Sequence, residues 1–267
     1  MTRLLVVLLI CYTSIFTSRA DHVIGGDITW TCQGGDYVFQ LVFYRDCNGA
    51  PINTTSETID VWGHSTMSSI NLPFISRSDI SPLCTEVPAG PQALACGSGA
   101  GGGNGVGAIE KIIYRSAPIA LSGTPPATGW VFTYQNFSRN AAVQNLVNPG
   151  SSGMTITSKM FEIPGSAGVC VDNSPQFLQD PYFVSCAGDP YTYNMNAVDP
   201  DLDSINISFG NPLNWFPSQV YTPPSIPAEI GYEPGFSQTS PTPGVSMNPG
   251  NIPSQLDPNS GELTFLS

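Results

Sequence analysis

The sequence predicts an all-β fold built from β-sandwich domains, and three observations support this prediction. Glycine and proline are abundant, with 27 and 25 residues among 267, and they interrupt nearly every window long enough for an amphipathic helix. Several segments alternate β-branched or aromatic residues with polar ones, as half-buried strands do. Only 10% of the residues are charged although 41% are hydrophobic, a balance typical of turn-rich β proteins rather than of disordered chains.

The first twenty residues, Met1 to Ala20, have the layout of a secretory signal peptide. Arg3 precedes the apolar run from Leu4 to Tyr12, and the segment has the small-residue ending Ser18-Arg19-Ala20. The apolar run is shorter than the roughly 18 residues that a membrane span needs, and no later stretch is apolar enough to cross a bilayer. We therefore expect an exported mature chain from Asp21, with no transmembrane segment in this portion.

Six cysteines remain in the mature chain, and an even number in an exported protein predicts disulfides. They are Cys32, Cys47, Cys84, Cys96, Cys170 and Cys186. Pairing of neighbours would join Cys84 to Cys96 and Cys170 to Cys186, which leaves Cys32 for Cys47. That last pair conflicts with geometry, because a hairpin turn at 33–36 places Cys32 opposite Tyr37 and carries Cys47 beyond bonding distance. The connectivity therefore stays open.

The mature chain is strongly acidic. Without Arg3 and Arg19 it has six Lys plus Arg against twenty Asp plus Glu, a formal charge of −14. A surface of this sign repels nucleic acid, whose binding proteins carry basic patches, and it attracts cations. We therefore expect no nucleic-acid partner.

The first domain is expected to span residues 21–166 and to open with a β-hairpin. Val23 to Cys32 and Tyr37 to Gly49 alternate β-branched and aromatic residues on both sides of a Gly-Gly turn. The same alternation predicts five further strands, at Thr58 to Trp62, Ser69 to Leu72, Ile109 to Arg115, Trp130 to Tyr134 and Met154 to Ile163.

Residues 172–177, with the sequence D-N-S-P-Q-F, predict a joint between this domain and a second one at 167–267. The proline favours an extended backbone, and Phe177 begins a buried strand. The run D-P-D-L-D at 199–203 follows, and Asp and Asn oxygens are the ligands that Ca²⁺ prefers. The sequence thus predicts a calcium site made of Asp172, Asn173, Asp199, Asp201 and Asp203. The alternative is a solvated β-turn, because Asp and Pro form turns in any protein.

The rest of the second domain has weaker signals. Ser204 to Phe209 alternates polar and apolar residues and predicts a half-buried strand. A proline-rich stretch from Asn211 to Pro253 is too broken for regular structure, and a turn ending at Gly261 then leads into a strand through Phe265. An Ig-like sandwich needs further strands, so we expect this domain to be incomplete at the end of the chain.

Two sets of motifs resemble known families. H-V-I-G-G-D-I-T-W-T-C at 22–32, Y-R-D-C-N-G at 44–49 and the strand-loop text at 130–140 are similar to the opening of large exported surface proteins of gliding Bacteroidetes. The usual paired cysteines of that loop are Phe137 and Ser138 here. D-N-S-P-Q-F and D-P-D-L-D resemble the calcium-binding linkers of cadherins and cadherin-like bacterial repeats.

These resemblances imply tandem Ig-like or cadherin-like β-sandwich domains, the second one truncated. They further imply type IX secretion, a place at the bacterial cell surface, and a role in gliding motility or adhesion. Other surface proteins or extracellular polysaccharide would then be the partners.

The sequence favours a structural or adhesive protein over two alternatives. Trp30, Trp62, Trp130 and Trp215 could stack on sugars in a carbohydrate-binding module, although such residues more often anchor a sandwich core. His22 and His64 lie outside any recognisable catalytic motif, so we predict no enzymatic activity and place a hydrolase last. Exposed coplanar rings would favour sugar binding, and a deep pocket with converging titratable groups would favour an enzyme.

Overall fold

The computed structural model describes residues 22–49, 53–82, 94–97, 103, 107–137, 139–166, 169–181, 187–216, 221–223 and 225–266. Within these residues the chain is all-β with antiparallel sheets, which confirms the predicted fold class. The predicted signal peptide, Cys84 and Cys186 lie outside the described residues. No helix of the described part is long and apolar enough to cross a membrane.

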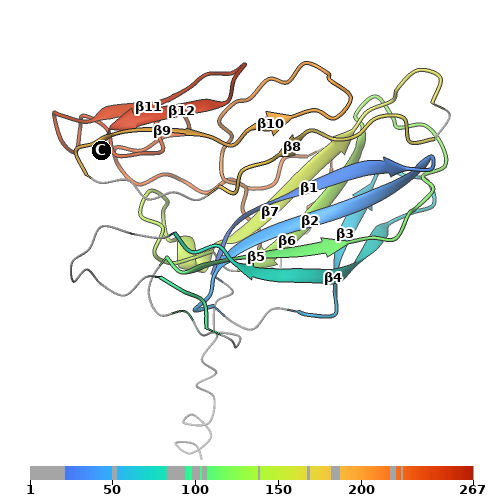
Figure 1. The fold of residues 1–267 in the computed structure, drawn as a ribbon, viewed down its shortest axis with the longest axis horizontal. Helices are drawn as coiled ribbons and strands as arrows, with labels where there is room; N and C mark the ends of the chain where they lie inside the picture. The colour runs from blue at the N-terminus through green and yellow to red at the C-terminus, as the bar shows by residue number, and fades with distance from the viewer. Residues whose placement is uncertain are drawn as a thin grey trace, which may run out of the picture.

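Twelve strands and one short 3-10 helix make up the described secondary structure (Figure 1). They are β1 (Val23–Gln33), β2 (Asp36–Asp46), β3 (Ser56–Trp62), β4 (Ser69–Asp79), β5 (Ile109–Arg115), β6 (Trp130–Phe137), η1 (Pro149–Ser151), β7 (Gly153–Met160), β8 (Gln176–Phe177), β9 (Pro190–Asn194), β10 (Ala197–Val198), β11 (Ile252–Leu256) and β12 (Glu262–Leu266).

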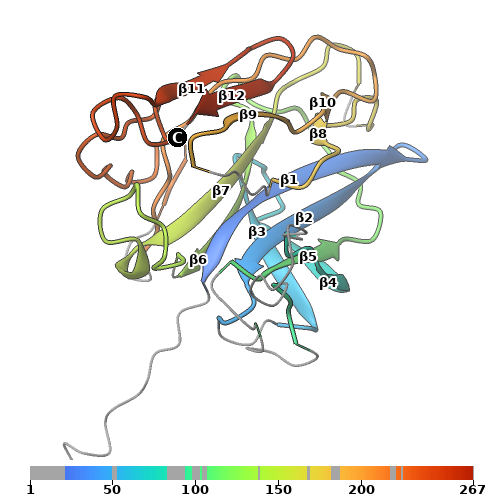
Figure 2. The same cartoon turned by 60° about the vertical axis from the view of Figure 1, so that its left-hand side comes forward.

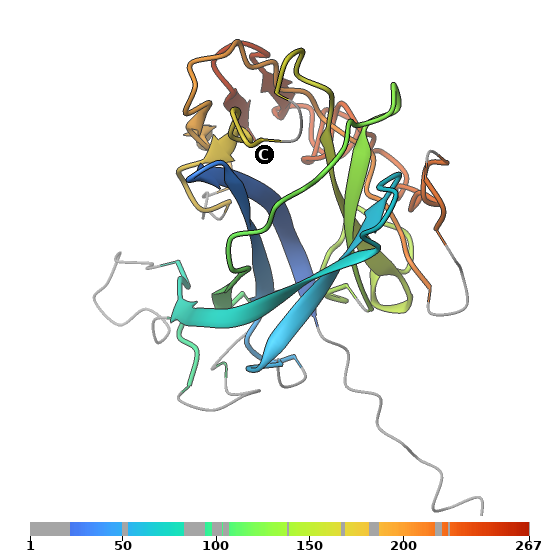
Figure 3. The same ribbon diagram turned by 90° about the vertical axis from the view of Figure 1, so that its right-hand side faces the viewer.

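The first seven strands form one antiparallel sheet, in the order β1-β2-β5-β4-β3-β6-β7, which folds over on itself. β4 makes the corner, because its first half pairs with β3 and its second half with β5, and the register shifts between Phe74 and Ser76. The two ends of the sheet then meet: a side chain on Gly26 of β1 would lie 2.7 Å from Ile156 of β7. Figure 3 shows the blue and the green strands on opposite sides of the interior that results.

The interior of this sandwich is aromatic. The rings of Trp30, Phe39 and Phe132 lie with centroids 4.6 to 6.2 Å apart, and Trp130 is 2% exposed. All seven strands contribute to this one cluster of buried side chains. Trp30 and Trp130 are therefore core residues, which corrects the expectation that they could offer flat surfaces to sugars.

The hairpin and the five further strands predicted for the first domain are present. Gly34 and Gly35 form its two-residue turn with φ of 63° and 92°, a backbone that glycine adopts without strain, and Cys32 faces Tyr37 as predicted. β5 has the predicted bounds, whereas β4 continues to Asp79 and β7 ends at Met160.

The C-terminal region carries two small sheets beside the sandwich (Figure 2). β9, β12 and β11 form one, and Gly261 with φ of 73° precedes β12 as the sequence predicted. The prediction of a strand at 204–209 is wrong. Burial alternates along these residues, but they join no ladder, and the Ile207 N–H donates instead to the Pro258 carbonyl at 2.8 Å. β8 is only two residues long, so Phe177 is 48% exposed rather than buried.

Candidate functional site

The predicted joint runs along the outer edge of β1. The Asn173 side-chain oxygen accepts a hydrogen bond from the Cys32 N–H at 2.8 Å. Ser174 bonds to both backbone groups of Trp30: its Oγ accepts from the Trp30 N–H at 2.8 Å, and its own N–H donates to the Trp30 carbonyl at 3.1 Å. An edge strand otherwise leaves such groups unpaired. Asn173 and Ser174 therefore fasten the start of the C-terminal region to the sandwich.

A disulfide between Cys32 and Cys170 closes the same joint, with the two Cα atoms 5.3 Å apart. A second disulfide joins Cys47 to Cys96. The predicted pairs Cys84–Cys96 and Cys170–Cys186 are therefore wrong. Disulfides follow proximity in the fold rather than along the chain, and the joint brings residue 170 beside the end of β1 although 138 residues separate the two cysteines.

The predicted calcium ligands lie together at this joint. The carboxylate of Asp201 accepts the Asn173 backbone N–H at 2.6 Å and both of its oxygens accept from the Asn173 side-chain amide. The Asp199 side chain accepts the N–H groups of Asp201 and Asp203 at 2.9 and 3.4 Å, which holds residues 199–203 in a tight turn. The sequence thus identified five residues that the fold brings to one place.

The charged side chains of this cluster are all carboxylates. Burial raises the pKa of Asp172, and the negative charges of Asp201, Asp199 and Asp203 raise it further. The N–H donors of Asn173 lower the pKa of Asp201. None of the ion pairs between described residues involves these carboxylates. The cluster therefore carries negative charge that a cation would neutralise.

Carboxylate and amide oxygens are the type of ligand that Ca²⁺ binds, but the carboxylates of this cluster are not gathered around one point. Among the described residues, no three of these carboxylates offer oxygens that all lie within 4.8 Å of one another. Asp201 and Asp203 are exposed, and Leu202 between them is 91% exposed, so the turn has room to tighten. Side-chain rotation at the turn would be needed to gather the oxygens around one ion.

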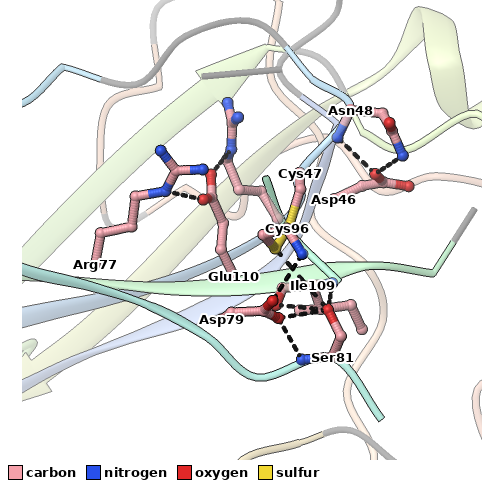
Figure 4. Close-up of polar contacts among 10 residues, drawn as sticks. Asp46, Cys47, Asn48, Arg77, Asp79, Ser81, Cys96, Ile109 and Glu110 are labelled. Carbon is pink, nitrogen blue, oxygen red and sulfur yellow. Dashed lines mark hydrogen bonds and ion pairs between the residues drawn. A yellow bond between two sulfur atoms is a disulfide. The ribbon is translucent and has the colours of Figure 1, made fainter. Parts of the chain in front are cut away.

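A buried ion-pair cluster that the sequence analysis missed lies inside the sandwich (Figure 4). Glu110 of β5 accepts from Arg45 of β2 and from Arg77 of β4, one oxygen to each. Arg45 and Glu110 are 1% and 0% exposed, and they face each other directly across the ladder. Glu110 shares the core-facing side of β5 with Ile112 and Tyr114, and a charge in that position was the signal that could have revealed a buried partner.

The residues next to Arg45 also have structural partners. Asp46 accepts from the Asn48 N–H and side chain at 2.8 Å each, and from the Asn140 side chain at 3.2 Å. Arg139, beside Asn140, donates to the carbonyls of Gly153 at 2.9 Å and Leu213 at 2.8 Å. Asp46 of the motif at 44–49 thus meets Asn140, which belongs to the segment at 130–140 that the sequence analysis singled out.

A second contact between the sandwich and the C-terminal region centres on Asp180. Its Oδ1 accepts from Lys111 of β5 at 2.6 Å and from the Tyr44 hydroxyl of β2 at 3.0 Å. Asp27 lies nearby in a cavity of about 230 Å³ that Tyr44 and Phe177 also line. Burial raises the Asp27 pKa to about 6, with Lys111 opposing and Asp180 adding to the shift.

The histidines occupy structural positions. His64 Nδ1 accepts the N–H groups of Thr66 and Met67 at 3.2 and 3.0 Å, and its ring lies 4.7 Å from that of Trp130. The carbonyl of His22 accepts the Asp46 N–H at 3.0 Å. Neither contact joins a histidine to a nucleophile or to a carboxylate.

Comparison of the chain with protein-family models, with curated proteins and with solved structures found no match.

Proposed function

We propose that this chain belongs to an exported surface protein with a structural or adhesive role, in which calcium stiffens the joint between two β regions. The observation that carries the proposal is the joint itself. A disulfide, the side chains of Asn173 and Ser174, and the Lys111–Asp180 pair all fasten the C-terminal region to the sandwich. One disulfide, several hydrogen bonds and an ion pair across the same boundary favour a fixed orientation of the C-terminal region on the sandwich over independent motion of the two.

The acidic cluster supports the calcium part of the proposal. Asp172, Asp199, Asp201 and Asp203 gather at the joint without a basic partner among the described ion pairs. Burial raises the Asp172 pKa, and the negative charges of the other three carboxylates raise it further. An ion at this point would neutralise the repulsion and connect the linker to the turn at 199–203. Free energy of calcium binding would then add to the free energy of unfolding, because the unfolded chain lacks the site.

The motif resemblances extend the proposal to class and location. Similarity to the opening of gliding Bacteroidetes surface proteins and to cadherin-like linkers suggests Ig-like or cadherin-like repeats, type IX secretion, and other surface proteins or extracellular polysaccharide as partners. The polar residues of the motif at 44–49 support a structural reading, because they are engaged in contacts within the fold: Tyr44 with Asp180, Arg45 with Glu110 and Asp46 with Asn140.

The test is thermal unfolding of the chain without residues 1–20, first in excess EDTA and then in millimolar Ca²⁺. At about a hundredfold excess over Kd, calcium adds about 2.7 kcal/mol, so we expect Tm to rise by roughly 5 °C or more. Asp203→Asn removes a charge at the cluster with little change in shape, and Asp257→Asn does the same at an exposed turn elsewhere.

The two variants separate specific from general effects. The calcium-induced rise should shrink in Asp203→Asn and persist in Asp257→Asn. Equal melting curves with and without calcium, or an equal rise in both variants, would refute the calcium joint and leave residues 199–203 as a solvated turn.

A further inference from the structure

A pocket lies where residues 214–216, 221–223 and 225–228 lie against β6 and β7. Its volume is about 350 Å³, and its walls include Gln135 of β6 together with Trp215, Tyr221, Thr222 and Ser225. Trp62 of β3 lies next to Tyr221, with the two ring centroids 6.4 Å apart. Trp62 and Trp215 are half-buried, in contrast to the two tryptophans of the core.

The base of the pocket is fixed to the sandwich through Asn214, which is 8% exposed. The Asn214 side-chain oxygen accepts the N–H groups of Gly153 at 2.9 Å and Trp215 at 2.7 Å. Its backbone oxygen accepts from the Thr155 hydroxyl at 2.8 Å, and its N–H donates to Ala228 at 2.6 Å. These bonds hold Trp215 in place without a ligand, so binding would require little ordering of the chain.

Gly153 makes this arrangement possible. A Cβ atom at this position would lie 2.2 Å from the Trp215 carbonyl oxygen, closer than any side chain can approach. The lack of a side chain on β7 therefore lets the backbone of residue 215 pack directly on the sheet.

The lining combines aromatic rings with uncharged polar groups. Gln135 donates through Nε2 to the Thr155 hydroxyl at 3.0 Å, which orients its side-chain oxygen as an acceptor. Thr222 and Ser225 add hydroxyl groups that are exposed, and burial raises the pKa of Tyr221, whose hydroxyl stays protonated. Among the described residues that line the pocket, none is Asp, Glu, Lys or Arg.

We propose that this pocket binds a neutral saccharide of one or two rings. Sugar rings present an apolar face to Trp215 and Tyr221 and hydroxyl groups to the amide and hydroxyls around them. A volume of about 350 Å³ is at the small end of ligand pockets. Without residues 1–20 the formal charge is −14, which disfavours acidic polysaccharides and is compatible with an uncharged sugar. The inference is independent of calcium at the joint.

The experiment is a titration by isothermal calorimetry of the chain without residues 1–20. The probes are disaccharides of glucose, galactose and N-acetylglucosamine, with a polyproline hexapeptide as the competing class of ligand. At least one disaccharide should bind with a saturable signal. Trp215→Ala should weaken its affinity about tenfold, and Gln135→Ala should weaken it several-fold.

Phe177→Ala is the matched control, because this aromatic residue is 48% exposed and lies outside the pocket. It should leave the affinity unchanged, and the melting temperatures of all variants should confirm that they fold. Three results would each overturn the proposal: no disaccharide binds at 10 millimolar (about the weakest affinity such a titration can detect), Trp215→Ala binds as the parent does, or the peptide alone binds.

Discussion

Asp27 should make the protein less stable as the pH rises through 6. Its carboxyl group lies in the cavity between β1 and the segment at 177–181, and burial raises its pKa from 3.8 to about 6. Lys111 opposes this shift and Asp180 adds to it. Because the folded pKa lies above the unfolded one, the folded chain holds the proton more tightly. The stabilising contribution is complete below pH 4 and is lost as the pH passes 6.

The magnitude follows from the shift of the pKa from 3.8 to about 6. It corresponds to about 3 kcal/mol, and we take this as an upper limit because Asp27 is only half-buried. Asp27→Asn keeps the shape and removes the charge. The variant should therefore match the parent at pH 4 and exceed its free energy of unfolding by about 2 kcal/mol at pH 8.

Urea unfolding at pH 4, 6 and 8 measures this difference directly. Asp189→Asn, at an exposed position, is the control for a general effect of net charge. A difference between Asp27→Asn and the parent that is constant across pH would refute the reasoning, as would an Asp27→Asn variant that is less stable than the parent at pH 8.

Two further predictions concern the covalent and ionic contacts. The Cys32–Cys170 disulfide spans 138 residues, so its removal by serine substitution should cost up to about 5 kcal/mol in urea unfolding; a loss below about 1 kcal/mol would show that the noncovalent contacts alone hold the joint. Glu110→Ala leaves the buried Arg45 without its carboxylate partner and should cost about 3 to 5 kcal/mol, whereas the exposed Glu262→Ala should cost little; equal losses would contradict a buried ion pair.

Local patterns predicted the strands of the sandwich well. The Gly34-Gly35 turn fixes the register of the hairpin. The alternation of side chains with a period of two predicts both the first and the last residue of β5. Such signals depend only on neighbouring residues. The acidic turn at 199–203 has the same local character, since the Asp199 side chain accepts hydrogen bonds from N–H groups two and four residues away.

Long-range contacts escaped prediction because no local pattern specifies them. Both disulfides join segments whose proximity depends on the complete sheet order. The stretch at 204–209 has the burial alternation of a strand, but no neighbouring strand lies beside it to complete a ladder. Alternation predicts an extended backbone with two faces, whereas a strand also needs a partner that only the tertiary fold supplies.

The end of β2 explains why the motif at 44–49 is rich in polar residues although its first three residues lie in a buried strand. Successive side chains of a strand point to opposite faces. Arg45 faces the core and pairs with Glu110, whereas Tyr44 faces outward and bonds to Asp180 of the C-terminal region. One strand therefore contributes to the sandwich interior on one face and to the joint on the other. A force on the C-terminal region would be transmitted through Tyr44 to a strand that is second in the sheet order and is paired on both sides.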